Sequence, residues 1–271
     1  MFEKIILLPS WFMALVFFIY GSFFGSFANV VIFRLQQDPP VSLFKKSYCP
    51  HCQRAIPVYL NIPILSWFIL RGACANCSKP FSFRYSAVET LMSFLFAGLF
   101  LVIGWKWFLL EALVFAVGLV SASFIDWDQM IIPDSLSLSG IGVGLLGAFL
   151  NPERSFLSSF LGALIGGGGL LLIAYLYYLL KKKQGLGGGD IKMLAWIGAV
   201  LGWQSLFFVL LIACLLGTVF GLTIMLQSNK KLMQTAFPFG PCLALSALIY
   251  IFLRESHSPF LSLFRIDLSV F

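Results

Sequence analysis

The chain has 271 residues, of which 60% are hydrophobic, 17% aromatic and only 11% charged, with a formal net charge of +7. Its mean hydropathy of +0.95 excludes an ordinary soluble domain and indicates a membrane protein. In such a protein the positive charge is first a signal of how loops divide across the membrane, so we expect no nucleic-acid partner.

Eight apolar segments are each a candidate for a membrane-spanning helix, which needs about 20 mostly apolar residues. They cover residues 11–33, 86–104, 108–125, 135–150, 157–180, 191–201, 204–226 and 239–253. We therefore predict an all-α polytopic membrane protein with about eight transmembrane helices. The first is too long for the core of a cleaved signal peptide and is expected to be retained. The sixth is short and begins with glycines, so a half-helix or re-entrant element is its alternative.

Lysine and arginine divide unevenly between the two sides of these eight spans. One side holds 13 of the 18, namely Arg34, Lys45, Lys46, Arg54, Arg71, Lys79, Arg84, Lys181, Lys182, Lys183, Lys192, Lys230 and Lys231. Because cytoplasmic loops carry the positive excess, this side is predicted to face the cytoplasm and both termini to lie outside. We expect a first transmembrane helix at 1–34, a cytoplasmic loop domain at 35–85, a transmembrane domain at 86–254 and a non-cytoplasmic tail at 255–271.

The predicted loop domain contains two C-x2-C pairs separated by 21 residues, formed by Cys49, Cys52, Cys74 and Cys77. Each pair can present two sulfurs to one ion, so the spacing predicts a structural zinc site. Redox cysteines and unliganded thiols are the alternatives, which a reducing cytoplasm disfavours. His51 is expected only to fill its turn, and Cys214 and Cys242, which lie in apolar spans, are expected to be packing residues.

Two carboxylates, Asp126 and Asp190, are predicted to lie at similar depth on the cytoplasmic face, although they are 64 residues apart. Two close carboxyls share a proton, so one can activate water while the other polarises a carbonyl, which is the chemistry of aspartic proteases. Gly187 and Gly189 lack Cβ atoms and would let an extended substrate approach. As an alternative, Asp190 caps the sixth helix, as Asp134 could start the fourth.

Six motifs in this order make the chain resemble the type IV prepilin peptidases, also called prepilin leader peptidases or bifunctional prepilin peptidase and N-methyltransferases. The motifs are GSFANVVIFRL (25–35), YCPHCQRAIPVYLNIPILSWFILRGACANC (48–77), FRYSAVE (83–89), FIDWDQMIIPD (124–134), GLGGGDIK (185–192) and FPFGP (237–241). The resemblance covers most of the chain.

The resemblance implies a GxGD-type aspartic endopeptidase at the cytoplasmic face of a bacterial inner membrane. Its substrates would be type IV prepilins or the pilin-like pseudopilins of secretion systems, from which it removes a basic leader. Asp126 and Asp190 match the catalytic positions, with Asp128 as the competitor for the first acid. Lys192 is expected to set the local charge or to bind a lipid headgroup or the substrate. No oligomeric state is predicted.

The resemblance also implies N-methylation of the new N-terminus with S-adenosylmethionine as the methyl donor. It places this activity around the first cytoplasmic loop, with Glu89 as a candidate residue, and so makes 35–85 a methyltransferase-associated region and 86–254 the peptidase domain. Two other classes of function compete. A transporter would use the glycine-interrupted helices and acids as an ion path, and an assembly scaffold would use the zinc loop as a docking surface.

Overall fold

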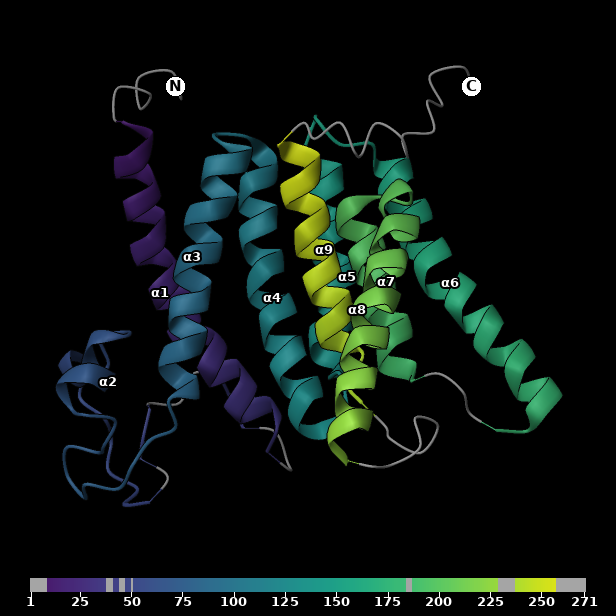
Figure 1. Ribbon diagram of the computed structural model, residues 1–271. Coiled ribbons are helices and arrows are strands. Elements are labelled where there is room, and N and C mark those ends of the chain that lie inside the picture. Colours follow the sequence, from purple (N-terminus) through teal and green to yellow (C-terminus); the bar gives the residue numbers. More distant parts are fainter. Residues whose placement is uncertain are drawn as a thin grey trace. The chain divides into compact units, whose positions relative to one another are not determined.

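The computed structural model in Figure 1 describes residues 9–37, 41–43, 47–49, 51–183, 187–228 and 237–256. The chain divides into two compact units, Met1–Trp105 and Lys106–Phe271. Among the described residues every extended regular element is a helix, apart from two isolated β-bridges. The predicted all-α fold class is thereby confirmed.

The first unit is built on two long apolar helices, α1 (Ser10–Leu35) and α3 (Arg84–Ile103). They pack closely because α1 has glycines on the shared face. A Cβ atom added to Gly21 would lie 2.5 Å from the carbonyl oxygen of Met92 in α3. Small residues give helices this close approach in membranes, where dispersion contacts rather than water exclusion hold helices together.

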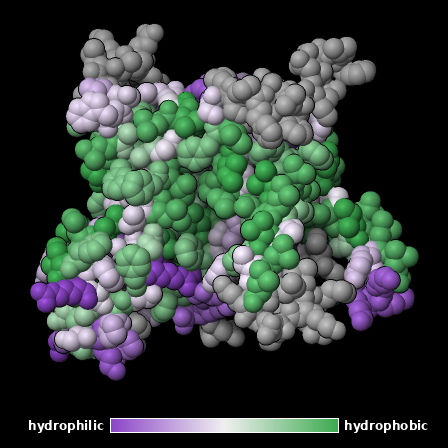
Figure 2. Space-filling model, viewed as in Figure 1, coloured by the Kyte–Doolittle hydropathy of each residue, from purple (hydrophilic) through white to green (hydrophobic). Residues whose placement is uncertain are grey.

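In the described part of the segment between α1 and α3, the helical elements are short: a 3-10 turn at Val58–Leu60 and the helix α2 at Leu65–Ile69. It joins the ends of two helices that lie side by side in the first unit (Figure 1). This segment carries the four clustered cysteines, and the space-filling view shows hydrophilic residues gathered over it (Figure 2).

The second unit contains the other six helices of the described chain. They are α4 (Trp107–Gln129), α5 (Asp134–Leu150), α6 (Phe156–Lys181), α7 (Gly188–Leu201), α8 (Gln204–Ser228) and α9 (Gly240–Glu255). Helix α7 is the core of this unit, because every residue from Met193 to Leu201 is buried. Trp196 of α7 fits against Gly118 of α4 and Gly140 of α5, where an added Cβ would lie 2.3 Å from its ring in each case.

Helix α6 contacts α7 only over its first half. Gly162 of α6 meets Gly198 of α7 so closely that a Cβ on either would lie 2.2 Å from the other's carbonyl oxygen. The carboxyl-terminal half of α6 leads away from the other helices of its unit (Figure 1), and most residues from Leu170 to Lys181 are exposed. Figure 2 shows this part as apolar, with hydrophilic residues at its carboxyl end.

Each of the eight predicted apolar segments forms a helix whose ends lie within four residues of the predicted ones. Among the described residues, however, only five helices are long and apolar enough to cross a membrane: α1, α3, α4, α6 and α8. Helices α5, α7 and α9 have 17, 14 and 16 residues. Eight membrane crossings are therefore not confirmed and stay a prediction.

The compact division also differs from the predicted domain boundaries. It falls after Trp105 and so keeps α3 with α1, because these two helices pack face to face. The predicted boundary between residues 85 and 86 followed membrane topology rather than compactness, and it stays a prediction.

Candidate functional site

Asp126 lies one turn before the carboxyl end of α4 and is only 5% exposed. Its Oδ2 atom accepts a hydrogen bond of 2.8 Å from the backbone N–H of Gly240, the first residue of α9. A Cβ atom at position 240 would lie 2.7 Å from the same oxygen, so the contact needs a glycine there. Sequence reasoning missed this role, although the glycine of the FPFGP motif just before an apolar helix was its signal.

Asp190 is the third residue of α7 and is half-buried. Its carboxyl interacts electrostatically with that of Asp126, and the thiol of Cys242 in the first turn of α9 interacts with both. The two acids are thus near enough for their charges to interact, and their role as a catalytic pair stays a prediction. The N-cap of α7 is Gly187, so Asp190 lies within the first turn and the capping alternative is wrong.

The residues around Asp190 differ in their contacts. An added Cβ at Gly187 would lie 3.2 Å from Asp190 Oδ2, whereas one at Gly189 would lie 3.1 Å from Cβ of the buried Ile132. Gly189 therefore lets the first turn of α7 pack on the segment before α5. Gln184, Gly185 and Leu186 lie outside the described residues.

Two further predicted site residues, Lys192 and Asp128, lie outside the contact between Asp126 and Gly240. The Lys192 ammonium pairs with Asp134 Oδ1 at 2.5 Å, which ties the second turn of α7 to the first residue of α5. Asp134 thus starts its helix as predicted and has a partner as well. Asp128 is exposed, unlike the buried Asp126 two residues before it.

A second cluster lies in the first unit, where the sulfurs of Cys49, Cys52, Cys74 and Cys77 are all within 4.8 Å of one another. The Cys49 and Cys77 sulfurs are 3.8 Å apart. Four sulfurs at about 2.3 Å from a central zinc form a tetrahedron with edges of about 3.8 Å. The cluster, which is compatible with a zinc site, is the one the sequence predicted, and His51 next to Cys52 is exposed.

The two cysteine turns have the same backbone geometry. In the first, Cys49 N–H donates to the Arg54 carbonyl at 3.0 Å, and in the second, Cys74 N–H donates to the Lys79 carbonyl at 2.9 Å. The residue after the second cysteine of each pair, Gln53 and Ser78, has a positive φ of 56° and 55°. The four thiols do not respond alike, because burial and the other three cysteines raise the pKa of Cys77 to about 11.

Further donors surround the sulfurs. Asn76 donates from its backbone N–H to Cys74 Sγ and from its side chain to Cys52 Sγ, and its Oδ1 accepts a 2.5 Å hydrogen bond from Arg54. The backbone N–H of Arg54 lowers the pKa of Cys52 to about 6, and the N–H groups of Cys77 and Asn76 lower that of Cys74. Metal ligands are held by such outer partners.

A pocket of about 230 Å³ opens beside this cluster within the first unit. Glu89 of α3 lines it and accepts a 2.7 Å hydrogen bond from the N–H of Ile64. On the same wall, Asn29 of α1 donates to the Tyr85 carbonyl at 2.9 Å. Trp67 also lines the pocket, and its buried Nε1–H has no hydrogen-bond partner within the described part of the chain. Glu89 is thus in the first unit, whereas Asp126 and Asp190 are in the second.

Two protein-family profiles match most of the chain. Residues 19–103 match the profile described as Bacterial Peptidase A24 N-terminal domain, and residues 113–222 match that of the Type IV leader peptidase family. Together the two matched ranges cover parts of both structural units.

Curated relatives match over similar lengths. The chain is 36% identical over 272 residues to the prepilin leader peptidase/N-methyltransferase of Aeromonas hydrophila, covering 92% of this chain and 93% of that protein. The proteins of the same name from Legionella pneumophila and Neisseria gonorrhoeae are 36% and 33% identical, over 94% and 87% of this chain and 96% and 89% of their own lengths. No solved structure gives a significant match.

Proposed function

The chain belongs to the type IV leader peptidase family, and from this premise we propose that it is a membrane enzyme that removes the leader from prepilins and then N-methylates the new terminus. The observation that carries the peptidase proposal is the meeting of Asp126 and Asp190, from helices far apart in sequence, beside the amino end of α9.

The acidic pair acts as an aspartic protease without a covalent intermediate. One carboxylate takes a proton from water as the water oxygen attacks the scissile carbonyl carbon, and the protonated partner donates to the carbonyl oxygen. The proton then passes to the leaving amine as the C–N bond breaks. Because Asp126 is buried and held by Gly240 whereas Asp190 is half-buried, the substrate reaches the pair from the side of Asp190.

The substrate is an extended backbone that passes the exposed Gly187 at the amino end of α7. Gly187 adds no side chain on this side of Asp190, so the peptide can approach closely. Lys192, held by Asp134, contributes positive charge near this site and attracts anionic lipid headgroups. The substrate class is the prepilin or the pilin-like pseudopilin of a secretion system, and nucleic acid is not a partner.

The four cysteines hold a structural zinc ion. Its site joins the two cysteine turns of a segment that has only short helices of its own, so metal binding contributes directly to folding there. Asn76 supports this role because it donates to one sulfur in each turn.

The pocket beside Glu89 holds S-adenosylmethionine, which supplies an electrophilic methyl group on a positively charged sulfur. The Glu89 carboxylate offers a negative charge toward a cationic donor, and Ile64 N–H holds it in place. Asn29 and the Tyr85 carbonyl fix the adjoining wall, where α1 meets α3.

The protein is a multi-pass component of a bacterial inner membrane, with the acidic pair at the cytoplasmic face. The uneven distribution of lysine and arginine supports this orientation. The exposed apolar surface of its long helices supports residence in lipid.

Cleavage of a purified prepilin by the wild type and by two aspartate variants tests the peptidase proposal. Asp126→Asn and Asp190→Asn are each expected to abolish cleavage while the folded protein accumulates normally. Asp128→Asn, which changes an exposed neighbour, is expected to cleave. Cleavage by Asp126→Asn together with its loss in Asp128→Asn would reassign the first acid.

Methylation is tested separately on a peptide that is already cleaved, with isotope-labelled S-adenosylmethionine. Glu89→Gln is expected to lose methyl transfer and to keep leader cleavage, because the residue lines the pocket of the first unit. Glu153→Gln, an exposed site in the second unit, is the matched control. Methyl transfer by Glu89→Gln at the wild-type rate would exclude this pocket residue.

A further inference from the structure

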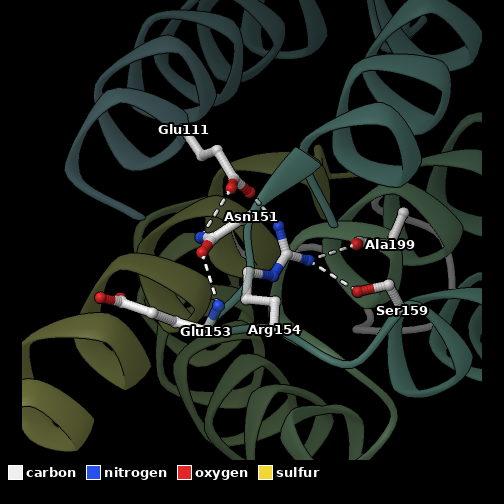
Figure 3. Close-up of polar contacts among 6 residues, drawn as sticks. All are labelled: Glu111, Asn151, Glu153, Arg154, Ser159 and Ala199. Atoms are coloured by element: carbon white, nitrogen blue, oxygen red, sulfur yellow. Dashed lines mark hydrogen bonds and ion pairs between the residues drawn. The ribbon is translucent and has the colours of Figure 1, made fainter. Parts of the chain in front are cut away.

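The second unit contains a buried ion pair that neither leader cleavage nor methylation uses directly. Arg154, in the connection between α5 and α6, pairs with Glu111 of α4, and their side chains are only 8% and 14% exposed. Figure 3 shows the two side chains among several polar neighbours. The loss of hydration offsets much of the attraction within a buried pair, so stability alone is a weak reason for its presence.

Glu111 is held on more than one side. Asn151 donates to Glu111 Oε1 at 3.1 Å, while Arg154 engages Oε2. The Asn151 side chain in turn accepts a 2.9 Å hydrogen bond from the N–H of Glu153 (Figure 3). The connection after α5 is therefore shaped so that Arg154 meets α4 at a fixed point.

The other side of the Arg154 guanidinium reaches the carboxyl end of α7. Its Nη2 atom donates to the Ala199 carbonyl at 2.8 Å and to Ser159 Oγ at 2.7 Å (Figure 3). If α7 continued, the N–H of Trp203 would donate to the Ala199 carbonyl. Here it donates instead to the Ser158 carbonyl at 3.2 Å. A cation suits the negative end of a helix, and an apolar surrounding makes an unpaired carbonyl costly.

Arg154 thus bonds the two helices that carry the acidic pair, at points far from the acids. Glu111 and Asp126 are both on α4, and Ala199 and Asp190 are both on α7. At about 1.5 Å per residue, Ala199 is about 14 Å from Asp190 along the axis of α7. A sliding of α7 against α4 would carry Asp190 with it, because a buried helix moves as a rigid rod.

We propose that Arg154 is a positioning residue for the acidic pair: by bonding Glu111 of α4 and the Ala199 carbonyl of α7, it sets the axial register in which Asp126 and Asp190 meet. The proposal rests on the proposed peptidase function. A displacement of about 1 Å at a reacting group can reduce the rate by about 100-fold, so even a small slip is measurable.

The decisive variant replaces both charges with apolar residues, Glu111→Leu with Arg154→Met. Removing a buried pair together leaves no uncompensated charge, and such replacements are often neutral for stability. The double variant is expected to unfold near the wild-type temperature yet to cleave prepilin with a kcat about 10- to 100-fold lower and an unchanged KM. Its pH profile of kcat is expected to shift, because the coupling between the two acids depends on their spacing. A loss of folded enzyme alone would leave that profile unchanged.

Lys106→Gln is the matched control, since it breaks the ion pair between Lys106, the N-cap residue of α4, and Glu255 of α9. It is expected to keep the wild-type kcat and pH profile. If the double variant does not fold, Arg154→Lys takes its place. Lysine lacks the planar guanidinium whose separate nitrogens bond Glu111 and the Ala199 carbonyl, so the same fall in kcat is expected. A wild-type kcat and pH profile in the folded variant would overturn the proposal. Failure of the wild type to cleave would instead refute the proposed function.

Discussion

The N–H of Gly240 donates a 2.8 Å hydrogen bond to Asp126 Oδ2, which places the amino end of α9 against the buried acid of α4. The contact orients one oxygen of the carboxyl, and in the proposed mechanism the other oxygen serves water and Asp190. An acid at a helix amino terminus is also favoured by the helix dipole. The first prediction concerns this contact.

Gly240→Ala is expected to reduce kcat for leader cleavage by about 10- to 100-fold, because its Cβ would lie 2.7 Å from Asp126 Oδ2 and would displace the carboxyl. Steady-state cleavage of a prepilin measures the change. Gly142→Ala, which adds a Cβ to α5 with no atom within 4 Å, is the matched control and should cleave normally. Equal rates for the two variants would remove Gly240 from the site.

Gly118→Ala is expected to lower the free energy of unfolding by about 1–3 kcal/mol, because its Cβ would lie 2.3 Å from the Trp196 ring. Thermal unfolding of the purified protein measures the loss. Trp196→Phe in the same chain should return part of it, since the smaller ring leaves room. Gly168→Ala in α6, where an added Cβ has no atom within 4 Å, should show no loss, and a similar loss there would point to a general effect of glycine replacement.

Cys77→Ser is expected to remove the metal, because three thiolates and a hydroxyl do not complete the tetrahedral set. Metal analysis of the wild type should give about one zinc per chain. Cys214→Ser, which changes an exposed cysteine of α8, should keep it. A metal-free preparation with unchanged unfolding behaviour would speak against a structural zinc.

The ion pair of Lys192 with Asp134 is expected to contribute only about 0.2–1 kcal/mol, because the two side chains are 37% and 62% exposed. A double-mutant cycle with Lys192→Met and Asp134→Asn measures the coupling, which should decrease with added salt. If Lys192 instead binds the substrate, Lys192→Met raises KM and Asp134→Asn does not. Equal small effects of both changes would assign the lysine to the helix contact alone.

The helices were predictable because apolar runs of sufficient length are local features of the sequence. The clustering of the four cysteines was predictable for the same reason, since two C-x2-C turns already bring their sulfurs into pairs. The number of membrane crossings was not, because α5, α7 and α9 are short helices whose apolar residues are equally suited to burial among other helices.

The sequence by itself determined the helix positions, the set of four clustered cysteines and the choice of the two acids, since each depends on residue type and spacing. Only the tertiary structure decided that Gly240 holds Asp126, that Lys192 pairs with Asp134 and that Arg154 joins α4 to α7. These contacts link residues 43 to 114 positions apart and depend on how closely α7 packs. That packing comes from glycines of other helices opposite Trp196 and Gly198, which no local pattern reveals.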